Sequence, residues 1–333
     1  MKSTSSLTGG TGCLCLACTI ACFAMSQSMA LIYGAIGPVG DAVQKCDALQ
    51  ELVQSSSRGL VEVELARMNL LCAERASGAE KMDVPACLFR LEEWAKRVRV
   101  ETERHQYRYK HNPSEIENSE GFYKMLMIAV VLAEDFGVRY SSERRIDPSA
   151  ASANDKFFAD SRDVFLHGLL GPERRGTCSS LPVLYVAIGR QLSYPLKLVT
   201  TKGHLFVRWE GAGERFNIEA AGNGLNRFDD DYYRRWPFAI TSEEEKAEGY
   251  LQSLNPSGEL AVFLSIRVQC LRAAQRFKEA LDAQEQVCRL MPKSRIQPEL
   301  LEQLKRDVRE DRLATPQSSR VPENATKKTQ PKP

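Results

Sequence analysis

Hydrophobic positions recur with the period of an α-helix through residues 45–137. Three segments predict amphipathic helices by this pattern: 60–75, 85–100 and 120–137. The second has Pro85 in its first turn, where a missing N–H is tolerated, and the third stops at Gly137, a residue typical of helix ends. The polar run between them, 104–120, predicts a connector. Residues 45–137 therefore predict a helical N-terminal region.

Beyond this region the pattern changes from the helical period to strict alternation. The segment DVFLHGLL (163–170) predicts a short helix, and LPVLYVAIGRQL (181–192) predicts a longer one. Three alternating runs then predict strands, at 195–201, 204–210 and 214–220, with GAG at 211–213 as a turn. Residues 138–245 thus predict an α+β core in which an antiparallel sheet packs against a helix.

The chain returns to the helical period after the predicted strands. Residues 258–292 indicate two helices that turn near Ala274–Phe277 and stop at Pro292. Their alternation of small and large residues resembles a tetratricopeptide unit, so we expect a tetratricopeptide-like hairpin over 246–295. Residues 310–333 are polar and rich in proline, which predicts a disordered tail.

The first 30 residues have the pattern of an export signal. Lys2 precedes an apolar run at 13–24, and small residues at Cys22–Ala24 and Ser28–Ala30 suit cleavage. We expect a signal peptide, or an anchor if it is not cleaved. The prediction is an exported protein, periplasmic or extracellular, or one tethered to a membrane by this segment.

Composition excludes some classes of function. Lys and Arg number 45 and Asp and Glu 43, and this net charge of +2 gives no reason to expect a nucleic-acid partner. None of the phosphate-loop, HExxH and GxSxG motifs occurs. The acidic runs Asp229–Asp231 and Glu243–Glu245 are more typical of helix starts than of metal sites. We therefore expect no metal and no cofactor.

Cys178 is the candidate nucleophile. It follows Gly176-Thr177 and precedes an apolar helix, so it is predicted at a helix N-terminus. Backbone N–H groups and the helix dipole stabilise a thiolate there and can donate to an oxyanion. The alternative is a small buried residue, which is what we expect of Cys46, Cys72, Cys87, Cys270 and Cys288.

His204 is the candidate base. It opens a predicted strand 26 residues after Cys178, and alternation places it on one strand face with Phe206 and Arg208. A polar residue on an apolar face needs a partner, which Cys178 would supply. We expect the other three histidines, His105, His111 and His167, to be exposed or incidental.

A third group should orient the imidazole through its other nitrogen. Asn217 and Glu219 share one face of the next predicted strand, and either could do so. A carboxylate stabilises an imidazolium better than an amide, so Glu219 is the first choice and Asn217 the alternative.

The order of cysteine, histidine and acid resembles the transglutaminase-like superfamily, which has a papain-like α+β fold. The motifs GTCSSLPVLYVAIGRQL, KGHLFVRW and FNIEAAGNG resemble its bacterial SirB-type proteins, in which tetratricopeptide-like helices follow the core. The resemblance implies that the family's cysteine and histidine fall on Cys178 and His204. Its aspartate falls on Glu219, a departure that adds one methylene.

Two functions follow from these residues. The first is a thiol enzyme in which Cys178 attacks an amide or peptide bond, resolved by water or by an amine, so that a protein or peptide is the expected substrate. The second is a non-catalytic scaffold that binds peptides with the same fold and its trailing helices.

Overall fold

The computed structural model describes residues 48–54, 64–144, 157–222 and 224–314, and the described residues from Glu51 onward form one compact unit. The helical elements are α2 (Leu65–Ala73), α3 (Val84–His111), η1 (Pro113–Ile116), α4 (Glu120–Val130), the π-helix η2 (Val131–Asp135), η3 (Ser142–Arg144), α6 (Ser161–Val164), α7 (Leu166–Leu170), α8 (Leu181–Gln191), α9 (Asp230–Tyr233), α10 (Ser242–Glu248), α11 (Pro256–Ala273), α12 (Phe277–Leu290) and α13 (Ile296–Ala314). The strands are β1 (Arg139–Tyr140), β2 (Arg175–Gly176), β3 (Leu196–Thr201), β4 (His204–Gly211) and β5 (Glu214–Ile218).

The N-terminal helices confirm the predicted pattern, with one correction. Asp83 caps α3 by accepting from the N–H of Ala86, and Pro85 lies in the first turn. The helix does not stop near residue 100 but continues to His111, so the predicted connector is mostly helix. Its polar C-terminal part is held by packing, since the ring of Tyr109 stacks on Tyr123 of α4 at 5.7 Å.

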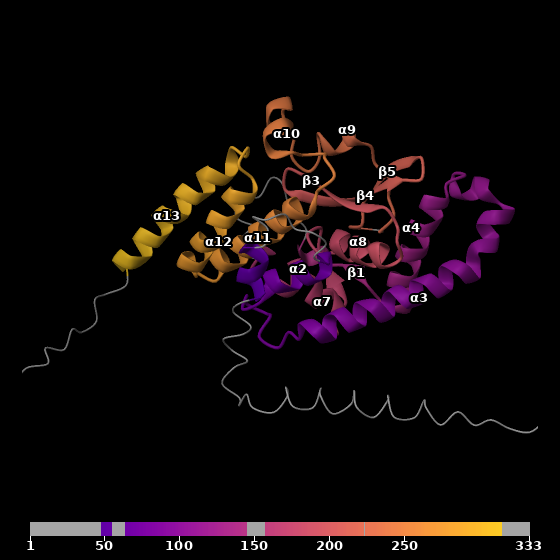
Figure 1. Cartoon of the computed structure of the whole chain (residues 1–333), viewed down its shortest axis with the longest axis horizontal. Helices are drawn as coiled ribbons and strands as arrows, with labels where there is room; N and C mark the ends of the chain where they lie inside the picture. Colours follow the sequence, from indigo (N-terminus) through magenta and orange to yellow (C-terminus); the bar gives the residue numbers. More distant parts are fainter. Residues whose placement is uncertain (1–47, 55–63, 145–156, 223, 315–333) are drawn as a thin grey trace, which may run out of the picture. The chain divides into compact units, whose positions relative to one another are not determined.

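The α+β core is a three-stranded antiparallel sheet in the order β3-β4-β5. Helix α8 lies against one face of the sheet, and the segment with α9 and α10 lies over the other (Figure 1). The outer edge of β3 is covered, because Leu251 and Leu254 donate to the carbonyls of Thr200 and Leu198. Because a layer covers each face of the sheet, β4 is buried from His204 to Trp209.

Two local features differ from the predicted elements. The segment 163–170 is not one helix, because Phe165 is extended and fully buried between α6 and α7. The side chain of Asn69 accepts from the N–H of Leu166 and so caps α7 from outside. A short parallel pair, β1 with β2, was not predicted, and it brings Tyr140 beside Gly176, two residues before Cys178.

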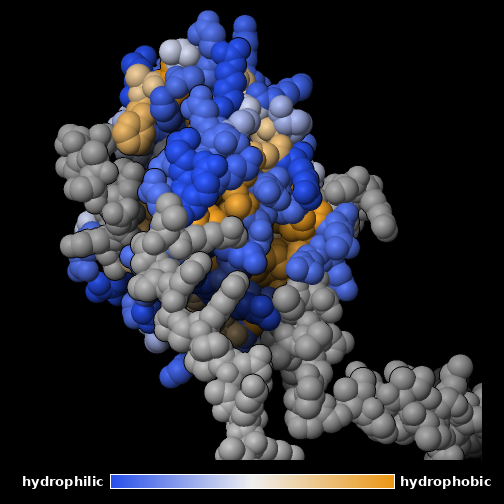
Figure 2. All heavy atoms as spheres, turned by 90° about the vertical axis from the view of Figure 1, so that its left-hand side faces the viewer, coloured by the Kyte–Doolittle hydropathy of each residue, from blue (hydrophilic) through white to orange (hydrophobic). Residues whose placement is uncertain are grey.

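Helices α11 and α12 pack against each other as a helical hairpin, and α13 packs onto α12. Val268, Leu271, Ala280, Ala283 and Leu304 form their common core. Figure 2 views the side of the molecule on which α12 and α13 lie, where polar side chains dominate and apolar ones show between them. The hairpin is joined to the core by Arg190 of α8, which pairs with the fully buried Glu259 of α11.

Predictions for the two ends of the chain fall largely outside the described residues. The predicted signal segment, 1–30, lies outside them entirely. Helix α13 continues to Ala314, four residues past the predicted start of the tail at 310, and residues 315–333 are again outside. Among the helices that the structure describes, none has the length and apolar composition needed to cross a membrane.

Candidate active site

Cys178 lies in a turn that leads into α8. The carbonyl of Thr177 accepts from the N–H groups of Ser180 and of the first residue of α8, so helical bonding begins before the helix itself. The hydroxyls of Thr177 and Ser180 both donate to the carbonyl of Asp163, at 2.9 and 3.0 Å, and fix the turn to α6. The N–H groups of Thr177 and Ser179 also have acceptors. Within this described turn, the N–H of Cys178 alone lacks a protein acceptor.

His204 begins β4 directly after the turn from β3. Gly203 has φ +74°, and a Cβ there would lie 2.8 Å from the ring of Phe238, so the turn requires glycine. The imidazole is buried between two aromatic rings of the segment after β5. Trp236 meets it edge-on at 4.7 Å, and Tyr233 lies nearly parallel at 6.1 Å.

Glu219 directly follows β5 and reaches His204. Its Oε2 accepts from Nε2 of His204 at 2.7 Å, and both side chains are buried. The same oxygen accepts from the hydroxyl of Tyr233 at 3.3 Å, while Oε1 accepts from the N–H of Ala221 at 2.9 Å. Three donors therefore hold this carboxylate in one position.

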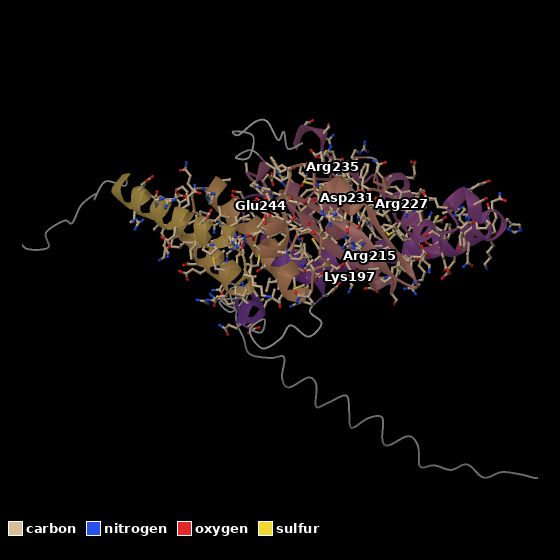
Figure 3. All side chains as sticks on the ribbon, turned by 90° about the horizontal axis from the view of Figure 1, so that it is seen from above. Lys197, Arg215, Arg227, Asp231, Arg235 and Glu244 are labelled. Carbon is tan, nitrogen blue, oxygen red and sulfur yellow. The ribbon has the colours of Figure 1, made fainter. Side chains whose placement is uncertain are left out.

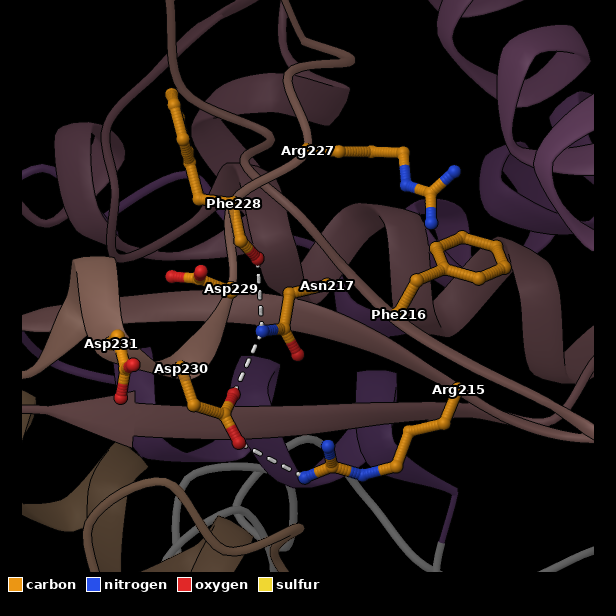
Figure 4. Close-up of a pocket in the computed structure, with 8 residues that line it drawn as sticks. All are labelled: Arg215, Phe216, Asn217, Arg227, Phe228, Asp229, Asp230 and Asp231. Atoms are coloured by element: carbon orange, nitrogen blue, oxygen red, sulfur yellow. Dashed lines mark hydrogen bonds and ion pairs between the residues drawn. The ribbon is translucent and has the colours of Figure 1, made fainter. Parts of the chain in front are cut away.

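Asn217 lies on the same strand face but does not hydrogen-bond to His204. It is opposite Arg208 in the ladder, and its Oδ1 accepts from Nε of that arginine at 2.8 Å. Figure 4 shows its amide nitrogen directed to the carbonyl of Phe228 and the carboxylate of Asp230. Both amide atoms thus serve a buried network around Arg208, in a pocket separate from the thiol.

The charges around His204 favour its protonated form. Burial by itself would lower the pKa of His204, whereas interactions with the Cys178 thiol and the Glu219 carboxylate raise it, and the pKa lies at about 9. At neutral pH the imidazole is therefore a cation that lies between the sulfur of Cys178 and the carboxylate of Glu219.

The other described cysteines have a different environment. Burial raises the pKa of Cys72 and of Cys270 to about 12, and it raises the pKa of Cys87 and Cys288 as well. Cys72, Cys87 and Cys270 are buried, as predicted, and Cys288 is half-buried. Desolvation thus keeps these four as thiols at neutral pH.

Cys178, His204 and Glu219 line one cavity of about 360 Å³. Its remaining walls come from the β1 strand, the turn before β4 and the segment that follows β5. Among the described residues, no cluster of histidine, cysteine or acidic side chains could hold a metal ion. Asp229 and Glu244 instead cap the starts of α9 and α10.

Comparison with known families decides the classification. A sequence model of the transglutaminase-like superfamily matches residues 87–261, more than half of the chain. The chain belongs to the transglutaminase-like superfamily. Searches of curated proteins and of solved structures found no match. The matched region begins in α3, contains the turn of Cys178 and the whole sheet, and ends in α11.

Within this transglutaminase-like region, sequence patterns missed several residues of the site. Tyr233 and Trp236 contact the imidazole or its carboxylate, but α9 is only four residues long and Trp236 follows it, so no periodicity assigns either residue to a face. The prediction for His167 needs correction, because it is only 8% exposed and contacts the Ser161 hydroxyl at 3.2 Å. Burial lowers the pKa of His167 to about 4, which keeps it neutral.

Proposed function

We propose that this protein is a thiol enzyme that acts on amide or peptide bonds through Cys178, His204 and Glu219. The observation that carries the proposal is the 2.7 Å hydrogen bond between His204 and Glu219 in the cavity that also contains the thiol. Membership in the transglutaminase-like superfamily adds support, because it implies a thiol-protease-like fold. Fold alone would not be sufficient.

The chemistry assigned to each group follows its position. The proton of the Cys178 thiol lies on the nitrogen of His204 that does not face Glu219 before the substrate reacts, and the thiolate of Cys178 attacks the carbonyl carbon. The N–H of Cys178 donates to the oxyanion that forms. His204 then protonates the leaving amine, and a thioester remains. His204 is now neutral and takes the proton of the water or second amine that attacks the thioester, and the departing sulfur restores the thiolate beside the imidazolium.

Selective alkylation of Cys178 tests this proposal without a known substrate. At pH about 6, well below the ordinary thiol pKa, iodoacetamide should modify Cys178 at least about tenfold faster than the half-buried Cys288, because the imidazolium stabilises the thiolate. Peptide mapping after brief labelling would measure both rates. The advantage should disappear in the His204→Ala variant, which leaves Cys288 unaffected.

A contrary result would be equally clear. If Cys178 reacts no faster than Cys288, or if His204→Ala leaves its rate unchanged, the thiol-enzyme proposal is wrong. The second candidate would then apply, a non-catalytic protein that binds peptides. The observation that favours it is the stack of α11, α12 and α13 behind the core, a surface of the kind that repeat proteins use for binding.

We also infer a place within the superfamily and a location. The motifs around Cys178 and His204, with the hairpin of α11 and α12, support a SirB-type protein with trailing tetratricopeptide-like helices. The apolar run at 13–24 supports export, with a protein or peptide as substrate. An N-terminus of the native protein near residue 24 or 30, read by mass spectrometry, would support export, and an intact Met1 in the cytoplasm would contradict it.

A further inference from the structure

Three aromatic rings form a continuous wall that ends on His204. Phe228 and Tyr232 stack at 4.0 Å with planes 13° apart, Tyr232 and Trp236 are 5.5 Å apart, and Trp236 meets the imidazole at 4.7 Å. The spacing of four residues explains the alignment, since the N–H of Trp236 donates to the carbonyl of Tyr232 as in a helical turn. We call Phe228, Tyr232 and Trp236 the aromatic wall.

The aromatic wall lines the same cavity as Cys178 and remains partly exposed. All three rings contribute to the 360 Å³ cavity, and Trp236 is 38% exposed. Large exposed aromatic surface beside a concave site is typical of binding sites, because burying it against a ligand is favourable. The described chain supplies nothing that covers it.

Charge in the cavity favours an uncharged ligand group. The carboxylate of Glu219 is already occupied by its three donors. Figure 3 labels Arg227, Asp231 and Arg235, charged neighbours of the aromatic wall in sequence, and none of them is among the described residues that line the cavity. Asp231 is paired with Arg234. An ammonium group would therefore find aromatic faces there but no free carboxylate.

We propose that the aromatic wall is a substrate subsite for a large apolar or aromatic side chain, next to the amide bond that Cys178 attacks. The substrate class is thus a polypeptide with such a residue at the reacting position, and Trp236 determines the specificity. This inference rests on the proposed function, because the reacting bond is the one assigned to the thiol. The position of Trp236 between the imidazole and Tyr232 lets a bound ring stack in line with the wall.

Peptidyl chloromethyl ketones that differ only in the residue beside the reactive group test the subsite. We expect the phenylalanine reagent to alkylate Cys178 at least about tenfold faster than the lysine or glutamate reagent, each measured by intact mass on the full chain. Trp236→Ala should bring the three rates to within about threefold, and Trp236→Phe should restore part of the preference. Phe89→Ala, which removes an exposed ring on α3, is the matched control and should keep the preference.

A second measurement separates this inference from the proposed function. Binding of acetyl-phenylalanine amide and acetyl-lysine amide to the Cys178→Ala variant, followed by NMR, requires no reactive thiol. The subsite is supported if Cys178→Ala binds the phenylalanine amide more tightly than the lysine amide and Cys178→Ala/Trp236→Ala does not. This result would hold even if Cys178 proves unreactive to iodoacetamide. Equal binding, a preference for lysine, or selectivity that survives Trp236→Ala would overturn the subsite even if the thiol is reactive.

Discussion

At the scale of single residues, the position of Glu219 in the strand register explains how it reaches the imidazole. The ladder ends where Ile218 pairs with Val207, and Glu219 is the next residue, on the strand face that also carries His204. Diagonal neighbours on one face are separated by about 7–8 Å, within reach of a long side chain. The length of the glutamate side chain is therefore compatible with the 2.7 Å contact, and the hydroxyl of Tyr233 restrains its carboxylate.

The contribution of Glu219 can be measured on His204 itself. In Glu219→Gln the negative charge is lost while burial remains, so the pKa of His204 should fall from about 9 by about 1–3 units. An NMR titration of the imidazole signals would measure the shift. Asn217→Ala is the comparison, since Asn217 bonds to Arg208 and Asp230 instead. A larger shift in Asn217→Ala would make Asn217 the orienting group.

At the scale of helices and strands, the sequence predicted which elements form but not which residues they bring together. Period two placed Asn217 and Glu219 on one face of their strand, but alternation carries no register, so it could not say which of the two reaches His204. Local signals such as Pro85 and Gly137 placed helix ends well. The path of the segment after β5, which supplies the aromatic wall, depends on tertiary contacts between distant residues, and no local pattern encodes it.

The attachment of α11 to α8 gives a prediction at this scale. Arg190 donates to Glu259, whose side chain is 1% exposed. Arg190→Met would leave a buried carboxylate without its cation, so we expect a loss of about 3–5 kcal/mol in the free energy of unfolding. Urea denaturation would measure it. Lys305→Met breaks an exposed pair within α13 and should cost at most about 1 kcal/mol. Equal losses in the two variants would show that the buried pair does not secure the hairpin.

At the scale of the whole molecule, two buried histidines act on stability in opposite directions. The pKa of His204 is raised to about 9 in the folded chain, so the stability it contributes is complete below its ordinary pKa of about 6.5 and is lost as pH rises through 9. The pKa of His167 is lowered to about 4, so its contribution is complete above about 6.5 and is lost as pH falls toward 4. These two residues together favour a stability maximum near pH 6.5.

The slopes of the free energy of unfolding against pH, below and above pH about 6.5, test the roles of His167 and His204. Burial is the main cause of the lowered pKa of His167, and the nearby charges are those of Asp160, Glu80 and Arg162. The variant His167→Gln has no group that can take up a proton at this position. Free energies of unfolding from urea titrations between pH 4 and 9 should fall on the acid side by up to about 1.4 kcal/mol per unit of pH from His167 alone. His167→Gln should flatten the acid limb and leave the alkaline limb, whereas His204→Gln should do the reverse. Each variant can differ in absolute stability, so the slope is the quantity to compare. If both variants keep both slopes of the unmodified chain, other groups set its pH dependence and the two histidines do not.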